Sequence, residues 1–421
     1  MNLEIRKHFT TREIILIISS SSSYPMWGFA LFITSFCLQY RRAAKCSKDI
    51  KDIYKRKLRI AVLASKADFE GPLTVLSALP PEAQIVAVGA SLEDWKAQWD
   101  GIKDNKLDTK SSYSISGASY QISGDYFNAN CLLIASASGS ILGPALCALP
   151  SLEWIQGVFA GLDHLVCPEF TNHGGKYIVT NGKGVFSSSL AEWTMFCCSY
   201  WYKQTHRFQA NKHQHKWEPF QVQELRGKTL GVVGYGDIGQ AVAKLAKSYQ
   251  MKVVGVRKRP EQSAGDPFID AIHGMERLPD ILAQSDFLVV AAALTPATTG
   301  MIGAKELSLC KDGQVLINVG RGKLIDEEAL IHVLTNAAQA DHDGKPYHGL
   351  RCASLDVFAC EPLPASSPFW DLPNVFISSH NADMIPGYRH QSVQSFVNNC
   401  QRYLEFGPMA LQNVVNAKEG Y

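Results

Sequence analysis

Residues 230–239 read LGVVGYGDIG, an apolar run that opens into a glycine-rich turn. The glycines at positions 234, 236 and 239 have G-x-G-x-x-G spacing, and residues 240–247 continue with helical periodicity. In this pattern the first glycine makes a tight turn, the second lets the backbone approach a pyrophosphate, and the third lets the helix pack on the strand. The strand before and the helix after predict a dinucleotide site. Its members are Gly234, Gly236, Asp237, Ile238 and Gly239.

Apolar runs of strand length recur on both sides of this motif. They cover residues 58–64, 84–88, 131–135, 230–233, 252–256, 286–293, 314–319, 352–357 and 374–378. Helix-like segments separate them, which is typical of parallel βαβ units whose sheet is covered on both faces. The pattern predicts an α/β protein with two doubly wound parallel-sheet domains, with a long apolar helix at residues 187–204 between them.

Composition narrows the class of protein. A chain of 421 residues with 46% hydrophobic and 19% charged side chains is globular and long enough for two or three domains. Its 41 basic and 39 acidic side chains nearly cancel, so no global field favours nucleic acid as a partner. The 11 cysteines show no Cys-x-x-Cys or zinc-finger spacing, so we expect no metal and a reducing, cytoplasmic location.

The first 56 residues do not fit the βαβ pattern. Residues 14–40 carry no charge and are flanked by basic residues, a length that could span a bilayer. The serine run at 19–23 and Pro25 divide the segment into two halves that are each too short to span alone. Three readings stay open: a signal anchor with the rest of the chain in the cytosol, a cleaved targeting segment for an organelle, or an extension without function.

The strand predicted at residues 252–256 ends in Arg257, Lys258 and Arg259. An NAD site usually has an acidic residue here that accepts from the ribose 2′-hydroxyl. Three cations could instead clamp a 2′-phosphate, with bidentate contacts from the guanidinium groups. We therefore expect NADP rather than NAD as the cofactor, and the alternative is an ordinary solvated loop.

Three further blocks carry a family resemblance. They read NVGRGKLID at 318–326, LDVFACEPLP at 355–364, and PFWDLPNV at 368–375, which runs on to His380. In this order, after the glycine motif, they resemble the D-isomer-specific 2-hydroxyacid dehydrogenases from about Lys57 to the C-terminus. The loop at 154–163 resembles that of the glyoxylate/hydroxypyruvate reductase branch most closely.

The resemblance implies a catalytic set that the chemistry also requires. Reduction of a 2-oxo acid needs a cation for the carboxylate and carbonyl and a proton donor at the developing alkoxide. Arg321 matches the cation, His380 the general acid, and Glu361 the carboxylate that favours the protonated imidazole. Taken singly, each residue would more often be a surface charge, a loop residue or a helix cap.

The resemblance also implies the binding residues. Ala160 and Gly161 match the turn whose backbone N–H groups bind the substrate carboxylate, together with Arg321. The residues that the resemblance places at the cofactor are Val319, Gly320, Arg321, Asp356 and His380. Asp356 could alternatively hold a turn at the end of its strand.

The resulting architecture is two interleaved domains and an N-terminal extension at residues 1–56. Residues 57–180, completed by 384–421, are expected to form a flavodoxin-like substrate domain, and residues 181–383 a Rossmann cofactor domain. The family implies a homodimer that transfers hydride from NAD(P)H to a small 2-oxo acid and forms a D-2-hydroxy acid. The alternatives are a phosphoglycerate dehydrogenase-like enzyme and a corepressor-like protein that senses dinucleotides.

Three departures from the family pattern stand out, and one of them is the N-terminal extension at residues 1–56, which has no family counterpart. Ser378 and Ser379 replace the usual Thr-Pro before the histidine, and residues 339–348 are expected to form an inserted surface loop.

Overall fold

The computed structural model describes residues 56–65, 68, 71–103, 112–115, 118–121 and 123–416. The described residues from Lys57 onward form one compact unit. The candidate membrane segment at 14–40 therefore lies outside the described residues. Within the described part, no helix is both long and apolar enough to cross a bilayer.

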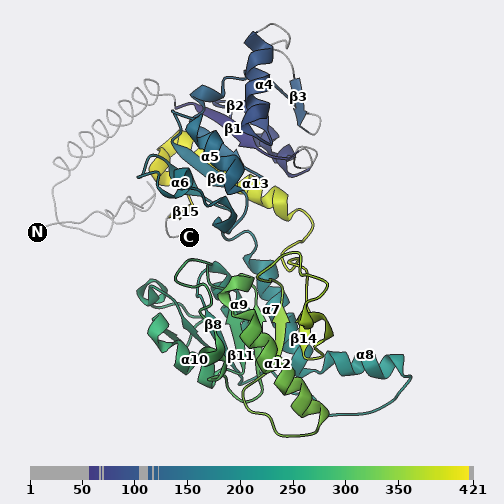
Figure 1. Cartoon of the computed structure of the whole chain (residues 1–421). Coiled ribbons are helices and arrows are strands. Elements are labelled where there is room, and N and C mark those ends of the chain that lie inside the picture. The colour runs from purple at the N-terminus through teal and green to yellow at the C-terminus, as the bar shows by residue number, and fades with distance from the viewer. Residues whose placement is uncertain are drawn as a thin grey trace, which may run out of the picture. The chain divides into compact units, whose positions relative to one another are not determined.

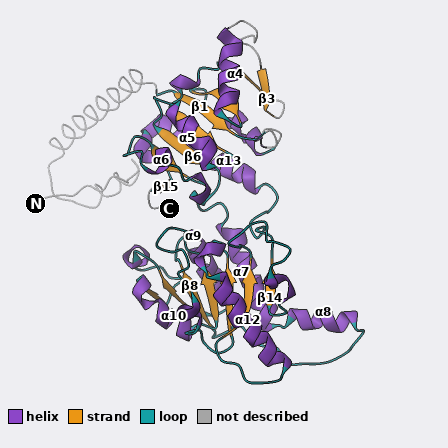
Figure 2. Cartoon of the chain, in the orientation of Figure 1, coloured by secondary structure: helices purple, strands orange, loops and turns teal. Residues whose placement is uncertain are grey.

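The N-terminal half of the described chain builds a six-stranded sheet (Figures 1 and 2). Its strands run in the order β15-β7-β6-β5-β1-β2, and all neighbours are parallel except the pair β15 and β7. Without β15 the order is that of flavodoxin-like sheets. The strands are β1 (Leu58–Leu63), β2 (Ala83–Gly89), β5 (Cys131–Ile134), β6 (Trp154–Gly157), β7 (Ile178–Thr180) and β15 (Val414–Val415).

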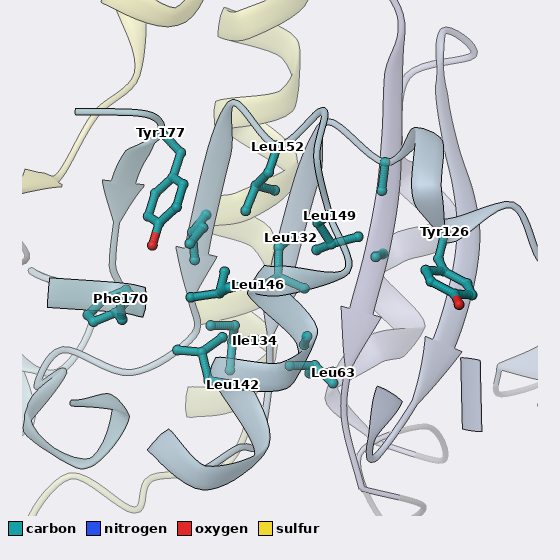
Figure 3. Packing of buried hydrophobic residues seen from close by; sticks show 14 of the residues in the cluster. Leu63, Tyr126, Leu132, Ile134, Leu142, Leu146, Leu149, Leu152, Phe170 and Tyr177 are labelled. Carbon is teal, nitrogen blue, oxygen red and sulfur yellow. The ribbon is translucent and has the colours of Figure 1, made fainter. Parts of the chain in front are cut away.

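Helices cover both faces of this sheet. Successive residues of a strand point to opposite sides, so a wholly apolar strand contributes to the core on each face. Leu132 and Ile134 face α4 (Leu92–Lys103), α5 (Gly139–Cys147) and α6 (Pro168–Thr171), as Figure 3 shows for the α5 side. Cys131 and Leu133 face the 3-10 turn Pro72–Ala78 and the long helix α13 (Tyr388–Phe406). The C-terminal helix thus packs in the core of this lobe.

The second lobe is a seven-stranded, fully parallel sheet of order β10-β9-β8-β11-β12-β13-β14. This order reverses direction between β8 and β11, which is the switch point of a Rossmann sheet. The strands are β8 (Thr229–Val233), β9 (Lys252–Val256), β10 (Ala271–His273), β11 (Phe287–Val290), β12 (Gln314–Asn318), β13 (Leu350–Leu355) and β14 (Val375–Ile377).

Two apolar cores cover the seven-stranded sheet. Helices α7 (Ser187–Tyr202) and α9 (Asp237–Ser248) pack on one face, against Val232 and Val289. Helices α10 (Leu278–Gln284), α11 (Ala304–Leu307) and α12 (Glu327–His342) pack on the other face, against Val233 and Val290. Helix α8 (Thr205–His213) buries no residue, and in Figure 1 it extends away from the sheet of its lobe.

The structure confirms the α/β class with two doubly wound sheets and corrects several details. The helix expected between the domains is α7, which packs against α9 within the seven-stranded lobe. The expected inserted loop is shorter, because α12 continues to His342 and only the residues after it form a loop. Short elements that the sequence analysis missed are β6, β7, β10, β15 and the antiparallel hairpin of β3 (Ser112–Ile115) and β4 (Ala118–Gln121).

Candidate active site

The glycine-rich turn after β8 lies at the switch point of the seven-stranded sheet. Gly234 has φ of +95°, and a Cβ there would lie 2.5 Å from the backbone of Ala292. A Cβ on Gly239 would lie 2.7 Å from the carbonyl oxygen of Gly234, so this glycine allows α9 to pack closely. A Cβ on Gly236 would meet no atom within 4 Å. Protein packing therefore explains two of the glycines, and room for a ligand fits the third.

Asp237, Ile238 and Gly239 form the first turn of α9. The first N–H groups of a helix have no acceptor within the helix, and with the helix dipole they favour an anion. The carboxylate of Asp237 pairs with the ammonium of Lys183 at 3.2 Å, which balances the acidic charge beside these N–H groups. The turn therefore fits the pyrophosphate of a dinucleotide.

The basic loop begins where β9 ends, on the strand beside β8. Arg257 donates from Nη1 to Ser263 Oγ at 2.6 Å and from Nη2 to Gln262 Oε1 at 2.7 Å. Partial burial, helped by the charge of Arg259, lowers the pKa of Arg257 from its ordinary value. Lys258 and Arg259 are exposed. The loop thus holds one arginine in a fixed orientation and exposes two further cations.

His380 and Glu361 come together after β14 and β13. Nδ1 of His380 lies 2.7 Å from Oε2 of Glu361, and the two side chains are 42% and 35% exposed. Glu361 Oε1 accepts from the backbone N–H of Phe358 at 2.9 Å, which fixes the carboxylate. This pairing leaves Nε2 as the ring nitrogen available to a ligand. The predicted dyad is thus present in the geometry.

Asp356 organises the loop that carries His380. Its side chain is buried, and Oδ1 accepts from Ser378 Oγ at 2.6 Å and from the N–H groups of Asn381 and Ala382 at 3.0 and 3.2 Å. His380 itself has φ of +51°, a left-handed conformation that is uncommon for a residue other than glycine. Asp356 therefore holds the turn, and its contact with the nicotinamide stays a prediction. Ser378, which departs from the family pattern, is part of this network.

Arg321 lies against the substrate turn after β6. A Cβ on Gly161 would fall 1.7 Å from Arg321 Nη2, so the guanidinium lies directly against this glycine. Nη1 donates to the carbonyl of Gly320 at 2.9 Å. Among the described residues no acceptor pairs with the N–H groups of Ala160 or Gly161, while Asn181 donates to the Ala160 carbonyl at 2.5 Å. Open N–H groups thus lie beside a guanidinium, an arrangement that suits a carboxylate.

Arg321 is also close to the segment that carries Glu361. A Cβ on Gly322 would lie 1.8 Å from the backbone of Phe358, so the two segments are in direct contact. Val319 and Gly320, which follow β12, lie at the level where β11 ends, with Gly320 close to the Ala292 carbonyl. The predicted residues of the seven-stranded lobe therefore converge on the carboxyl edge of its sheet, where open α/β sheets bind ligands.

Two acidic residues at this site had no role predicted from the sequence. Asp163 accepts from Arg321 Nε at 3.2 Å. Asp383 is partly buried, which raises its pKa; the positive charges of His380 and Arg321 oppose this, and Asp356 adds to it. Asp163 is the last residue of the loop at 154–163 that carries the family resemblance, although the motif gives it no role, and Asp383 lies three residues after His380 outside any motif. Within the described chain, no three His, Cys, Asp or Glu side chains gather as metal ligands.

Comparison with known proteins places this fold in a class of dinucleotide-dependent dehydrogenases. Residues 195–382 match the model of the D-isomer specific 2-hydroxyacid dehydrogenase, NAD binding domain. A glyoxylate reductase of Thermococcus gammatolerans is 30% identical over 280 residues, which cover 63% of this chain and 78% of that enzyme. The chain belongs to the D-isomer specific 2-hydroxyacid dehydrogenase family, whose members are NAD(P)-dependent.

Other relatives show how far the similarity extends. A D-3-phosphoglycerate dehydrogenase of Methanocaldococcus jannaschii is 34% identical over 235 residues, which cover 54% of this chain and 41% of that enzyme. The chain thus spans less than half the length of this relative. An NADPH-dependent glyoxylate/hydroxypyruvate reductase of Sinorhizobium meliloti, solved with NADP and sulfate, has the same fold, with a TM-score of 0.63 at 22% identity over 87% of this chain and 100% of that one.

Proposed function

We propose that the chain reduces a small 2-oxo acid, such as glyoxylate or hydroxypyruvate, and forms the D-2-hydroxy acid where a stereocentre arises. The observation that carries the proposal is that the structure forms two side-chain arrangements which the reaction needs. One is the His380–Glu361 pair, and the other is the guanidinium of Arg321 against the Gly161 turn. A proton donor and an anion site are what the reduction of a 2-oxo acid requires.

Each group has a separate task. The N–H groups of Ala160 and Gly161 bind the substrate carboxylate, and Arg321 attracts the carboxylate and polarises the carbonyl. His380 donates the proton from Nε2 to the carbonyl oxygen as that oxygen becomes an alkoxide. Glu361 keeps the ring oriented and balances the imidazolium charge. The bound nicotinamide supplies the hydride that adds to the carbonyl carbon.

The dinucleotide is proposed to be NADPH. Gly236 leaves room for the pyrophosphate at the first turn of α9, where the N–H groups of residues 237–239 have no acceptor within the helix. The residue that follows β9 is Arg257 instead of an acidic residue, and Ser263 and Gln262 orient its guanidinium. A planar guanidinium suits a 2′-phosphate better than a ribose hydroxyl.

We also propose the domain roles and the assembly. Residues 57–180 with 384–421 form the substrate domain, and residues 181–383 form the cofactor domain. The buried residues of α7 are accounted for by packing within the chain, yet Phe196 on α7 is 48% exposed and Trp217 beyond α8 is 95% exposed. Exposed aromatic side chains of this kind favour a homodimer formed through α7 and the following segment. Light scattering of the purified chain measures the assembly.

The test of the activity is an assay of the full chain with NADPH or NADH and a panel of 2-oxo acids, followed by absorbance of the reduced nicotinamide. We expect turnover with at least one small 2-oxo acid and a preference for NADPH. His380→Ala should lower kcat about 10²- to 10⁴-fold. His332→Ala, an exposed histidine on α12, is the matched control and should leave kcat nearly unchanged.

Two outcomes of this assay would contradict the proposed reduction of a small 2-oxo acid and favour another function. Tight NADPH binding without turnover of any acid would favour the dinucleotide-sensing protein over the enzyme. Turnover restricted to 3-phosphohydroxypyruvate would favour the phosphoglycerate dehydrogenase reaction, the activity named for the relative from Methanocaldococcus jannaschii.

A further inference from the structure

Asp68 is a buried carboxylate of the six-stranded lobe that has no part in the proposed mechanism. Its side chain is 2% exposed. Oδ2 accepts from the N–H and hydroxyl groups of Ser65, at 2.9 and 2.7 Å, and from the hydroxyl of Ser136 at 2.9 Å. Oδ1 accepts from Arg389 Nη1 at 2.9 Å. Four donors from three separate segments therefore converge on one acidic group.

This cluster lies at the carboxyl edge of the six-stranded sheet, beside the substrate turn. Ser65 follows β1 and Ser136 follows β5. Strand β5 pairs with β6 so that Ile134 is opposite Gly157, and Ser136 and Phe159 each lie two residues further along. Ser136 and the Ala160–Gly161 turn thus follow two neighbouring strands at the same edge of the sheet.

Helix α13 links Arg389 to the segment that precedes the substrate turn. Arg389 and Ser392 are three residues apart, so they lie on the same face of the helix about one turn, roughly 5 Å, from each other. The hydroxyl of Ser392 donates to the carbonyl of Val158, two residues before Ala160. Arg389 therefore lies on the face of α13 that also contacts the segment leading into the Ala160–Gly161 turn.

Arg389 is held in place but not enclosed. Nε donates to the hydroxyl of Tyr388 at 3.1 Å, Nη1 is taken by Asp68, and the side chain is 52% exposed. Nη2 has no partner among the described residues. Burying a carboxylate carries a desolvation penalty, and an apolar residue would fill the same place without it. The Asp68–Arg389 pair has a use that an apolar residue lacks, because it fixes the arginine donor in a set orientation.

We propose that Arg389, oriented by Asp68, is a specificity residue that donates a hydrogen bond to an oxygen on C3 of the substrate. The inference rests on the proposed function and narrows the substrate class to 2-oxo acids with a hydroxyl group on C3. Asp68 already balances the guanidinium charge, so the pair favours a neutral hydroxyl group over a phosphate at this position. Asp68 acts through Arg389 and is a positioning residue.

The test compares kcat/KM of the full chain for hydroxypyruvate, pyruvate, glyoxylate and 3-phosphohydroxypyruvate. The unaltered chain should prefer hydroxypyruvate to pyruvate and to the phosphate. In Arg389→Leu the ratio of hydroxypyruvate to glyoxylate should fall about 10- to 100-fold, the range for a hydrogen bond to a charged group. Arg389→Lys keeps a cationic donor group without the planar fork and should retain part of the ratio. Arg402→Leu, on the same helix, is the control and should keep it.

A second variant guards against misfolding. Arg389→Leu leaves the Asp68 carboxylate unpaired, so Asp68→Asn with Arg389→Leu removes both charges, and thermal unfolding shows whether each variant is folded. An unchanged hydroxypyruvate-to-glyoxylate ratio in folded variants overturns the inference and leaves the proposed function standing. An equal loss with all acids assigns the pair a purely structural role and also overturns it. If the unaltered chain reduces no acid, the proposed function fails first and the inference with it.

Discussion

Gly234 and Gly236 are two residues apart, yet the reason for having no side chain differs between the two positions. At Gly234 the requirement comes from the protein, through a positive φ and the nearby backbone of Ala292. At Gly236 the protein leaves open space, and only a bound molecule would fill it. Substitutions at the two positions should therefore separate folding from binding.

Gly236→Ala should leave the free energy of unfolding within about 0.5 kcal/mol, because the new methyl group meets no protein atom. It should weaken NADPH binding at least about tenfold, since the methyl group occupies the approach of the pyrophosphate. Gly234→Ala should instead destabilise the fold by about 1–3 kcal/mol or more through backbone strain and the clash with Ala292. Denaturant unfolding and calorimetric titration measure the two effects, and full NADPH affinity in Gly236→Ala would contradict this account.

Asp383 makes the stability of the chain depend on pH. Partial burial raises its pKa in the folded state above the value of about 3.9 for an unfolded chain. Between these two values the folded state binds more protons than the unfolded state, so the unfolding free energy falls as pH rises through that window.

Asp383→Asn removes the titrating group, so the variant should gain stability relative to the unaltered chain between pH 4 and pH 7. Urea unfolding at both pH values measures the gain. Asp371→Asn, at an exposed aspartate, is the control and should show a smaller difference. A gain for Asp383→Asn that is larger at pH 4 than at pH 7 would reverse the sign and reject the explanation.

At the residue scale, the order of the motifs and the family resemblance predicted Arg321, Glu361 and His380, and their catalytic roles stay predictions. The motifs did not predict the partner of Asp163, which meets Arg321 across 158 positions, or that of Asp68, which meets Arg389 across 321 positions. An aspartate in a polar segment looks the same whether it is solvated or buried against a distant arginine. Only the three-dimensional arrangement separates the two cases.

At the scale of an element, the loop after β9 should decide which dinucleotide binds. Replacing Arg257 and Arg259 together with Ala should weaken NADPH about 10- to 100-fold, because charge-assisted contacts to the 2′-phosphate are lost. NADH, which lacks this phosphate, should change less than about threefold. The double replacement of Arg277 and Lys305 by Ala removes the same charge elsewhere on the lobe and is the control. Fluorescence titration with both nucleotides measures the affinities, and equal losses would remove the loop from this role.

The longer elements could be predicted from the sequence, and the shorter ones could not. Strand β9 and helix α9 follow from continuous apolar runs and helical periodicity. Strand β7 has only three residues and β15 has two, too few to show any period, and their pairing is set by the sheet beside them. The end of α12 was misjudged because polar residues with Gly344 and Pro346 nearby resemble a loop from position 339 onward.

At the scale of the whole molecule, the six-stranded lobe depends on a helix that is remote in sequence. Phe396 of α13 is fully buried, with its ring centroid 5.2 Å from that of Trp154 on β6. Phe396→Ala should lower the unfolding free energy by about 3–5 kcal/mol, the usual cost of deleting a buried aromatic ring. Phe406→Ala, on the same helix at a residue 62% exposed, is the control and should change it by less than about 0.5 kcal/mol. Similar effects of the two substitutions in chemical unfolding would show that α13 does not stabilise this lobe.

The return of the chain to its first lobe affects the order of folding during synthesis. All strands of the seven-stranded sheet lie between Thr229 and Ile377, so this lobe can form as soon as that stretch has emerged from the ribosome. The six-stranded lobe waits for α13 and β15, including the contact of Asn399 with Gln156, 243 positions earlier. During that interval its sheet has one uncovered apolar face and lacks its last strand. We expect this half-built lobe to be the species that chaperones recognise on the nascent chain.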